Sequence, residues 1–224
     1  MTETISLWKQ VLAGAPQRVT RLHDELGQLV PLSRLVRNGP RAVVTGAMRL
    51  LFGYRPAKPW ISYDAQAILA RHLTKASTVL EFGSGMSTAW YAGYSGTVVS
   101  IESNDGWFKA VRERLSALGN VDYRFAPDRK AYVDLAPDQL YNLIMIDGSW
   151  RDECTAFAIE HLAPGGVIYL DNSDKGFDPM DTGNIPLARS LLMGLAKRDG
   201  LPMREFTDFA PTQLFVQRGL MVGG

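Results

Sequence analysis

The sequence predicts one α/β domain on a doubly wound parallel sheet, with a helical segment before it and an antiparallel strand at its end. Three observations lead to this prediction. Short apolar strand-like segments alternate with helical segments after residue 75, which is the pattern of parallel βαβ units. The last two strand-like segments are separated only by residues 210–213, too few for a helical crossover, so they form a hairpin. Residues 1–60 show helical periodicity and no strand pattern.

Residues 1–60 are therefore predicted to form a helical cap on a main domain of residues 61–224. Apolar residues recur at helical spacing over 7–32 and again over 42–52. Between these stretches, Pro31 and the cluster Asn38-Gly39-Pro40 are expected to interrupt the helix, because proline removes a helical hydrogen bond.

The main domain begins with a helix over 62–73, for which Ser62 is the expected N-cap. Seven strands rich in Val, Ile, Leu, Tyr and Phe follow, and five of them are expected to be parallel. The predicted strands cover 78–82, 97–101, 121–125, 141–146, 167–170, 203–209 and 214–217. The predicted helices between them cover 87–94, 106–118, 151–162 and 185–198, and the connection 128–140 has no clear periodicity.

Five successive strands deliver a carboxylate at or just past their carboxyl ends. In an open α/β sheet, ligands bind at this edge, near the switch in strand order. A single carboxylate in a loop carries little information, but its repetition at one edge predicts a binding site there. The carboxylates are Glu81, Glu102, Asp128, Asp147 and Asp171.

The loop after the first strand, Glu81-Phe82-Gly83-Ser84-Gly85, is the most informative motif. Gly83 and Gly85 let a ligand approach the backbone closely, and the next helix begins with unpaired N–H groups. A dinucleotide fingerprint would need a third glycine, which Met86-Ser87-Thr88 lacks, and the acid before the loop repels phosphate. The motif therefore indicates a cationic or amine-bearing ligand, with an ordinary strand-to-helix turn as the alternative.

Two further acids extend this site. Glu102 ends the second strand 21 positions after Glu81 (102 − 81), where an acid binds ribose hydroxyls in nucleotide-binding folds. Asp128 follows the third strand, where it can meet an adenine amino group or simply belong to a turn.

With these motifs, the chain resembles class I S-adenosylmethionine-dependent methyltransferases over residues 62–218. The matching segments are Leu80-Glu81-Phe82-Gly83-Ser84-Gly85, Ile101-Glu102, Ile146-Asp147-Gly148 and Leu162-Ala163-Pro164-Gly165-Gly166-Val167-Ile168. The resemblance implies a Rossmann-like seven-stranded sheet and S-adenosylmethionine as the cofactor. The expected cofactor contacts are Glu81, Gly83, Ser84, Gly85, Ser87, Glu102, Ser103, Asp128, Asp147 and Tyr63. Many members carry glycine where this chain has Ser87.

Asp147 and Asp171-Asn172 follow neighbouring strands. In the metal-dependent catechol and caffeoyl-type members that the chain resembles here, a similar set holds magnesium, and two carboxylates with an amide oxygen suit such a hard cation. Metal-free members carry acids at both places, and Gly148-Ser149-Trp150-Arg151 departs from the metal-dependent pattern. Without a metal, Asp147 is the candidate base or the partner of the cofactor's amine.

Arg151 is the second candidate catalytic residue, because its guanidinium can clamp a carboxylate or phosphate of the substrate with two hydrogen bonds. A salt bridge to Asp147 or Asp171 is the alternative. Cys154 is the only cysteine, and this excludes an intrachain disulfide and a cysteine-based zinc site. We expect the Cys154 side chain to be buried. His23, His72 and His161 are expected to have structural roles. With neither a signal peptide nor a long apolar run in the sequence, a cytoplasmic location is expected.

Residues 26–63 contain no acid, which leaves three roles open for the cap. It can pack on the domain or on a second subunit of a homodimer. It can lie on an anionic membrane through residues 34–58, or recognise a phosphate-bearing substrate. Trp60 and Tyr63 are candidates for closing over the cofactor. The cations of this stretch are Arg34, Arg37, Arg41, Arg49, Arg55 and Lys58.

The sequence thus predicts a methyltransferase that acts on a small molecule or saccharide, at oxygen. The net charge of +1 and the absence of an Asn-Pro-Pro-Tyr signature after the fourth strand favour an acceptor other than nucleic acid. The alternatives are a nicotinamide-dependent oxidoreductase, a non-catalytic or membrane-associated binding protein, and an enzyme that transfers another group from a related sulfonium.

Overall fold

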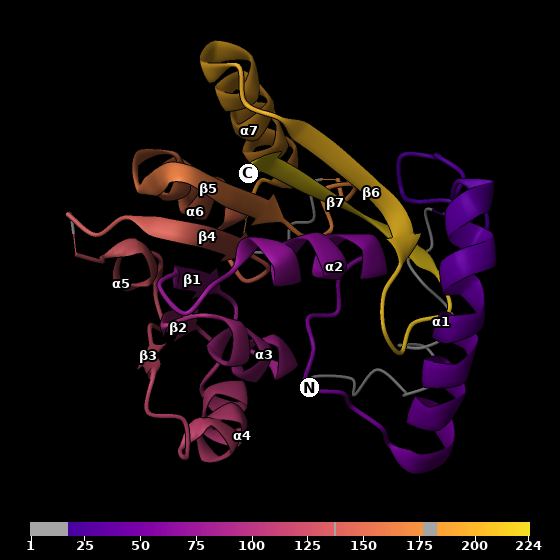
Figure 1. Cartoon of the computed structure of the whole chain (residues 1–224), viewed down its shortest axis with the longest axis horizontal. Coiled ribbons are helices and arrows are strands. Elements are labelled where there is room, and N and C mark those ends of the chain that lie inside the picture. Colours follow the sequence, from indigo (N-terminus) through magenta and orange to yellow (C-terminus); the bar gives the residue numbers. More distant parts are fainter. Residues whose placement is uncertain (1–17, 137, 177–182) are drawn as a thin grey trace.

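The computed structural model describes residues 18–136, 138–176 and 183–224. Its centre is a seven-stranded sheet with helices on both faces, and the long helix α1 (Leu32–Phe52) stands beside one end of the sheet (Figure 1). The strand order is β3-β2-β1-β4-β5-β7-β6, so the order reverses between β1 and β4. The strands are β1 Thr78–Phe82, β2 Thr97–Glu102, β3 Val121–Phe125, β4 Tyr141–Ile146, β5 Leu162–Leu170, β6 Met203–Phe209 and β7 Val216–Gly223.

The predicted direction of the last strand is confirmed. β7 pairs antiparallel with both β5 and β6, whereas the pairs among β1 to β5 are parallel. β5 begins earlier than the predicted 167–170, because Leu162 already pairs with Tyr141 before a register shift. β7 begins two residues after the start of the predicted 214–217 and extends past its end, since its backbone pairs with β6 as far as Val222 and with β5 as far as Gly223.

The helices of the main domain follow the predicted alternation. Ser62 caps α2, because its Oγ accepts hydrogen bonds from the N–H groups of Asp64 (3.2 Å) and Ala65 (3.4 Å). A short helix also occupies part of the connection 128–140. The helices are α2 Tyr63–His72, α3 Met86–Tyr94, α4 Asp105–Leu115, α5 Arg129–Val133, α6 Arg151–Glu160 and α7 Ile185–Asp199.

The prediction of a break at residues 38–40 was wrong, because α1 runs without interruption through Pro40. An internal proline costs about 3 kcal/mol, and tertiary contacts offset that cost. Asn38 is buried and its Nδ2 donates to Oδ2 of Asp208, 2.8 Å away. Ala42 packs in a cluster with Phe209 and Val216. Pro31 does bound the helix, as its N-cap.

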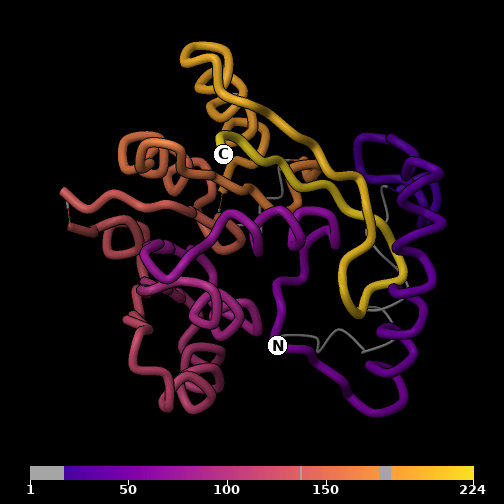
Figure 2. The backbone as a smooth tube through the Cα atoms, in the orientation of Figure 1, coloured from indigo at the N-terminus to yellow at the C-terminus, as the bar shows by residue number. Residues whose placement is uncertain are grey.

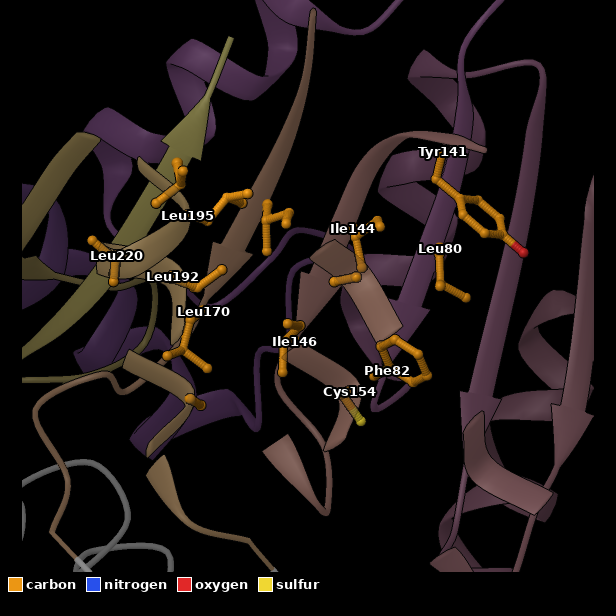
Figure 3. Close-up of a cluster of buried hydrophobic side chains, with 14 of the residues drawn as sticks. Leu80, Phe82, Tyr141, Ile144, Ile146, Cys154, Leu170, Leu192, Leu195 and Leu220 are labelled. Atoms are coloured by element: carbon orange, nitrogen blue, oxygen red, sulfur yellow. The ribbon is translucent and has the colours of Figure 1, made fainter. Parts of the chain in front are cut away.

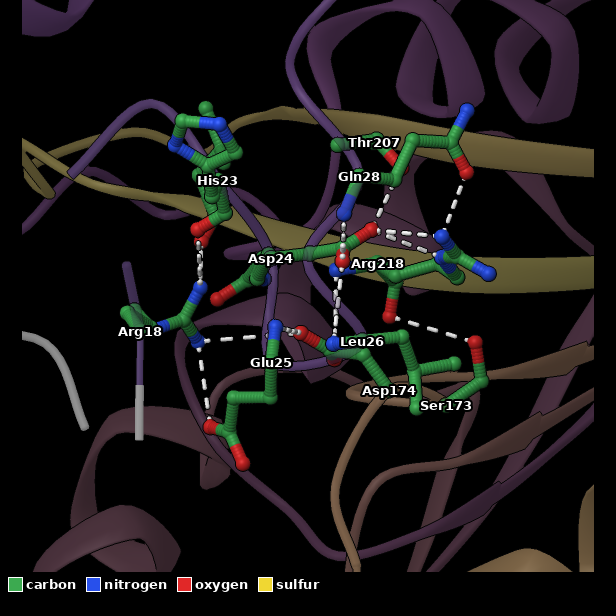
Figure 4. Close-up of polar contacts among 12 residues, drawn as sticks. Arg18, His23, Asp24, Glu25, Leu26, Gln28, Ser173, Asp174, Thr207 and Arg218 are labelled. Carbon is green, nitrogen blue, oxygen red and sulfur yellow. Dashed lines mark hydrogen bonds and ion pairs between the residues drawn. The ribbon is translucent and has the colours of Figure 1, made fainter. Parts of the chain in front are cut away.

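The predicted helix over 7–32 was also wrong for its described part, residues 18–31, which form turns and one isolated bridge between His23 and Leu29. Residues 7–17 of that prediction lie outside the described residues. Asp24 turns the chain, because its Oδ1 accepts from the N–H groups of Leu26 and Gln28. Its Oδ2 accepts from Arg218 at 2.8 Å and so ties the segment to β7 (Figure 4). Aspartate favours such turns over a helix interior.

Apolar side chains alternate between the two faces of the sheet and form a core on each. Leu80, Ile144 and Leu170 pack with α5, α6 and α7 on one face (Figure 3). Val79 and Leu143 pack with α2 and α3 on the other. Cys154 is fully buried in the first core, as predicted. With both faces covered, the carboxyl ends of the strands are left as the edge at which loops build a site.

Helix α1 packs beside the β6–β7 turn, as the chain trace shows (Figure 2). Gly46 lets the helix approach this turn, because a Cβ there would lie 3.0 Å from the side chain of Leu214. The cap thus borders the carboxyl edge of the sheet. The division of the chain at residue 60 stays a prediction.

Candidate active site

The glycine loop after β1 is pressed against the loop after β4. Gly83 has φ +93°, and a Cβ on it would lie 2.5 Å from the backbone nitrogen of Gly148. Only glycine fits both the backbone conformation and this contact. Gly85 is the N-cap of α3, and its N–H donates to Oγ1 of Thr88 at 3.2 Å. The loop is therefore more than a generic turn, because it brings the ends of β1 and β4 together.

Glu81 lies beneath this loop with no exposed surface. Its carboxylate accepts hydrogen bonds from the hydroxyls of Ser87, Thr88 (2.6 Å) and Ser100 (2.7 Å). Burial raises the pKa of Glu81 to about 7, although the three hydroxyl donors act in the opposite direction. The predicted acid therefore holds the loop, α3 and β2 together from below.

A cavity of about 200 Å³ opens above the loop. Its walls come from the predicted glycine loop, from Asp147 after β4, and from the segment before α2. Trp107 closes one side, and its Nε1 donates to the carbonyl oxygen of Ser84 at 2.8 Å. The lining residues are Lys58, Trp60, Gly83, Ser84, Gly85, Met86, Ser87, Trp107 and Asp147.

The end of β2 adjoins the loop as predicted. Glu102 is buried and accepts from Oγ of Ser84 at 3.0 Å and from the N–H of Asn104 at 2.8 Å. The hydroxyl of Tyr123 lies 2.6 Å from Ser84 Oγ, a contact the sequence prediction missed. No local sequence signal identifies this contact, because it depends on the parallel pairing of β2 and β3 that sets Tyr123 opposite Ser100. Ser103 reaches across the edge, with its Oγ 3.1 Å from that of Ser149.

Asp147 and Arg151 are adjacent, but only Asp147 faces the cavity. The Asp147 side chain is 42% exposed, whereas the Arg151 side chain is 6% exposed. The Arg151 guanidinium donates to the carbonyl oxygens of Gly148 (3.0 Å), Asp147 (2.9 Å) and Asp171 (2.5 Å), and to Oδ1 of Asp147 at 3.3 Å. Arg151 thus joins the loops after β4 and β5, and its donors are directed at the protein itself.

The two carboxylates predicted as magnesium ligands, Asp147 and Asp171, interact through their side chains. Burial, together with the charge of Asp147, raises the pKa of Asp171 well above its usual range. Its Oδ1 accepts from Gln217 at 3.4 Å, and the Arg151 guanidinium donates to the backbone carbonyl oxygen of Asp171 and to Oδ1 of Asp147. Asn172 occupies a turn with φ 48°. Across residues 18–136, 138–176 and 183–224, no three His, Cys, Asp or Glu side chains are grouped to hold a metal.

Two predicted cofactor contacts lie away from the cavity. Asp128 is the N-cap of α5, and its exposed carboxylate accepts from the N–H of Ala131 at 3.0 Å. Tyr63 is buried against α1, where its hydroxyl lies 3.2 Å from Oγ1 of Thr45. Trp60, in contrast, lines the cavity, and the Arg49 guanidinium carbon lies 4.5 Å from the centroid of its ring.

Comparison with known proteins places this arrangement in a fold class. No family model matches the chain, and no curated protein matches it. Three similar solved structures are described here. The first is a provisionally assigned O-methyltransferase from Klebsiella pneumoniae, with a TM-score of 0.60 and 19% identity over 84% of this chain and 98% of that one.

The second is an O-methyltransferase of tomaymycin synthesis from Streptomyces achromogenes, solved with S-adenosylmethionine, with a TM-score of 0.57 and 20% identity over 81% of this chain and 87% of that one. The third is an rRNA methylase from Streptococcus thermophilus, with a TM-score of 0.51 and 17% identity over 76% and 96%. At these identities the likeness shows the fold: the chain has the seven-stranded fold of class I S-adenosylmethionine-dependent methyltransferases. None of the helices in the described ranges combines the length and apolar character needed to cross a membrane.

Proposed function

We propose that the protein is an S-adenosylmethionine-dependent methyltransferase that acts at an oxygen atom of a small molecule or saccharide. The observation that carries this proposal is the cavity at the carboxyl edge, bounded by the glycine loop and Asp147. It lies where the strand order reverses, which is the ligand site of open α/β sheets. The buried carboxylate of Glu81 beneath the loop favours a positively charged ligand over a dinucleotide phosphate.

Every predicted cofactor contact except Tyr63 has a role in this proposal. The backbone of Gly83, Ser84 and Gly85 lies against the cofactor, and Glu102 accepts from its ribose hydroxyls. Asp147, the exposed acid of the cavity, accepts from the cofactor's amine or removes the proton of the acceptor hydroxyl. The bound cofactor supplies the sulfonium methyl group.

The remaining contacts form the outer part of the site. Ser87 lines the cavity and joins it to Glu81, and Ser103 supports the ribose end beside Glu102. Asp128 lies outside the cavity, and its exposed carboxylate would contact the adenine amino group where the cofactor extends beyond it. We move Tyr63 out of the cofactor set because it faces α1.

We propose that no magnesium ion takes part. The support is that the Arg151 cation already pairs with Oδ1 of Asp147, and that the Asp171 side chain is buried. Arg151 is then a positioning residue that fixes the loop carrying Asp147. A screen of phenols, carbohydrates and hydroxy acids with deuteromethyl-labelled S-adenosylmethionine, read by mass spectrometry, tests the activity. Equal rates in EDTA and in magnesium support the proposal, and a strict need for magnesium contradicts it.

A second role rests on the outer face of α1. Leu32, Val36 and Val43 share one face of this helix and are 74%, 68% and 59% exposed, and Leu51 near its end is 73% exposed. The surrounding residues 26–63 contain no acid. We propose that this face contacts an anionic membrane surface, because exposed apolar residues flanked by cations are typical of interfacial helices.

Co-sedimentation with phosphatidylglycerol vesicles at low salt tests this second role, and phosphatidylcholine vesicles are the control. We expect binding to the anionic vesicles only, and its loss in Val36→Asp. Failure to bind phosphatidylglycerol overturns the membrane role. A concentration-dependent dimer that Val36→Asp disrupts, with no vesicle binding, would identify the face as a subunit interface instead.

A further inference from the structure

A second cavity, of about 380 Å³, lies beside the cofactor cavity. It is bounded by the middle of α1, by the segment that leads into α2, and by Pro211, which follows the carboxyl end of β6. Lys58 lines both cavities, so they are neighbours. The lining residues are Pro40, Arg41, Val44, Thr45, Tyr54, Pro56, Lys58, Tyr63 and Pro211.

The charged side chains that line this cavity are all positive. Arg41 and Lys58 are its ionisable cations, and no Asp or Glu belongs to its lining. Among residues 18–136, 138–176 and 183–224, neither cation pairs with a carboxylate. The Arg41 guanidinium carbon lies 4.2 Å from the centroid of the Tyr63 ring, which orients the group without neutralising it. A cavity with unpaired cations and no acid attracts an anion.

One wall of this cavity is fixed by hydrogen bonds. Oγ1 of Thr45 lies 3.2 Å from the Tyr63 hydroxyl and accepts from the N–H of Thr212 at 3.0 Å. These contacts connect α1, α2 and the β6–β7 link. The prolines, Val44 and the two tyrosine rings add apolar surface, so the cavity suits a ligand with a planar apolar body and an anionic group.

A larger cavity, of about 540 Å³, does not share these properties. Arg34 and Arg37, two of its cations, both pair with Asp64, at 3.2 and 3.3 Å. Glu205 also lines it, and it reaches the first half of β6 rather than the carboxyl edge. It is therefore partly neutralised and lies away from the edge where the cofactor cavity opens.

We infer that the second cavity holds the methyl acceptor, and that this acceptor is a small aromatic molecule bearing a phosphate or carboxylate group. This inference rests on the proposed function for its reaction, but not for the binding itself. Arg41 and Lys58 would hold the anionic group while the tyrosine rings and prolines contact the aromatic body. The acceptor hydroxyl would then point past Lys58 toward Asp147 in the cofactor cavity.

Calorimetric titration of the full chain, saturated with S-adenosylhomocysteine, tests the inference. The probes are phenyl phosphate, benzoate and the uncharged phenol. We expect at least one anion to bind about tenfold more tightly than phenol, and Arg41→Ala to lose about tenfold in affinity for it. The two anions distinguish a phosphate site from a carboxylate site. Arg37→Ala, one turn earlier on the same helix and outside this cavity, should retain wild-type affinity.

Three outcomes would overturn the inference: no binding of either anion, equal binding of phenol, or equal losses in Arg41→Ala and Arg37→Ala. Thermal unfolding of both variants shows whether each is folded. S-adenosylhomocysteine is titrated first, so the two proposals fail separately. If it binds and the anions do not, the acceptor inference fails alone. If S-adenosylhomocysteine does not bind, but the anions bind in an Arg41-dependent way, the methyltransferase proposal fails alone.

Discussion

Glu81 is a buried carboxyl whose charge state matters for both stability and binding. Because its pKa is about 7 in the folded protein and near 4.5 when unfolded, folding favours its protonated form. The stability that this group contributes is present below pH 4.5 and is lost as pH rises through 7. At pH 8 the ionised, buried carboxylate destabilises the unliganded protein. A cationic ligand bound nearby would reduce this destabilisation.

We predict that Glu81→Gln removes this pH dependence. Between pH 5 and 8, the unfolding free energy of the wild type should fall relative to Glu81→Gln by an amount on the order of 3 kcal/mol. Urea denaturation without cofactor measures the difference. Glu113→Gln, at an exposed position of α4, should follow the wild type. Parallel curves for wild type and Glu81→Gln would contradict the assigned pKa.

Substitution of Arg151 tests whether its guanidinium stabilises the fold or binds the substrate. Its donors go to three backbone carbonyls in a buried position, so Arg151→Ala leaves those acceptors unpaired. We predict a loss of about 3 kcal/mol in unfolding free energy, measured by urea denaturation, with Arg151→Lys intermediate. Unchanged stability together with a raised KM for an anionic acceptor would restore the clamp role predicted from the sequence.

At the scale of elements, the contact between the loops after β1 and β4 determines the shape of the site. We predict that Gly83→Ala costs about 2 kcal/mol of stability or more, because of its left-handed backbone and its collision with Gly148. It should also weaken S-adenosylhomocysteine binding at least tenfold in titration calorimetry, a fold-change that corresponds to about 1.4 kcal/mol. Gly93→Ala on α3, where a Cβ meets nothing within 4 Å, is the control. Equal behaviour of the two variants would show that this contact is unimportant.

For the whole molecule, the sheet could be predicted because its signals are local. Each strand is a short apolar run, and the few residues before β7 force a hairpin. The conformation of the cap could not be predicted from the sequence, because it depends on partners far away in sequence. Asn38 bonds to Asp208, and Asp24 to Arg218, so tertiary contacts override both the proline rule and the helical periodicity.

For the site too, residues with a local sequence signal were predicted and residues placed by distant contacts were not. Gly83, Ser84, Gly85, Ser87 and Asp147 follow strands and were predicted to line it. Lys58 was missed because it comes from a connecting segment, whose position no periodicity fixes, and Trp107 was missed because it lies in the first turn of α4 rather than at a strand end. For Arg151 two roles were predicted, a ligand clamp and a salt bridge to Asp147 or Asp171, and the salt bridge to Asp147 is present. The three backbone carbonyls that Arg151 also contacts have no sign in the sequence.

The most direct test of the central claim is titration calorimetry with S-adenosylhomocysteine. We predict micromolar binding by the wild type and a loss of about tenfold or more in Glu102→Ala, which removes the acceptor of the ribose hydroxyls. Glu113→Ala, an exposed glutamate on α4, should bind as the wild type does. A folded wild-type protein that gives no binding heat and no thermal stabilisation with this ligand would contradict the claim that the carboxyl-edge cavity is a methyltransferase cofactor site.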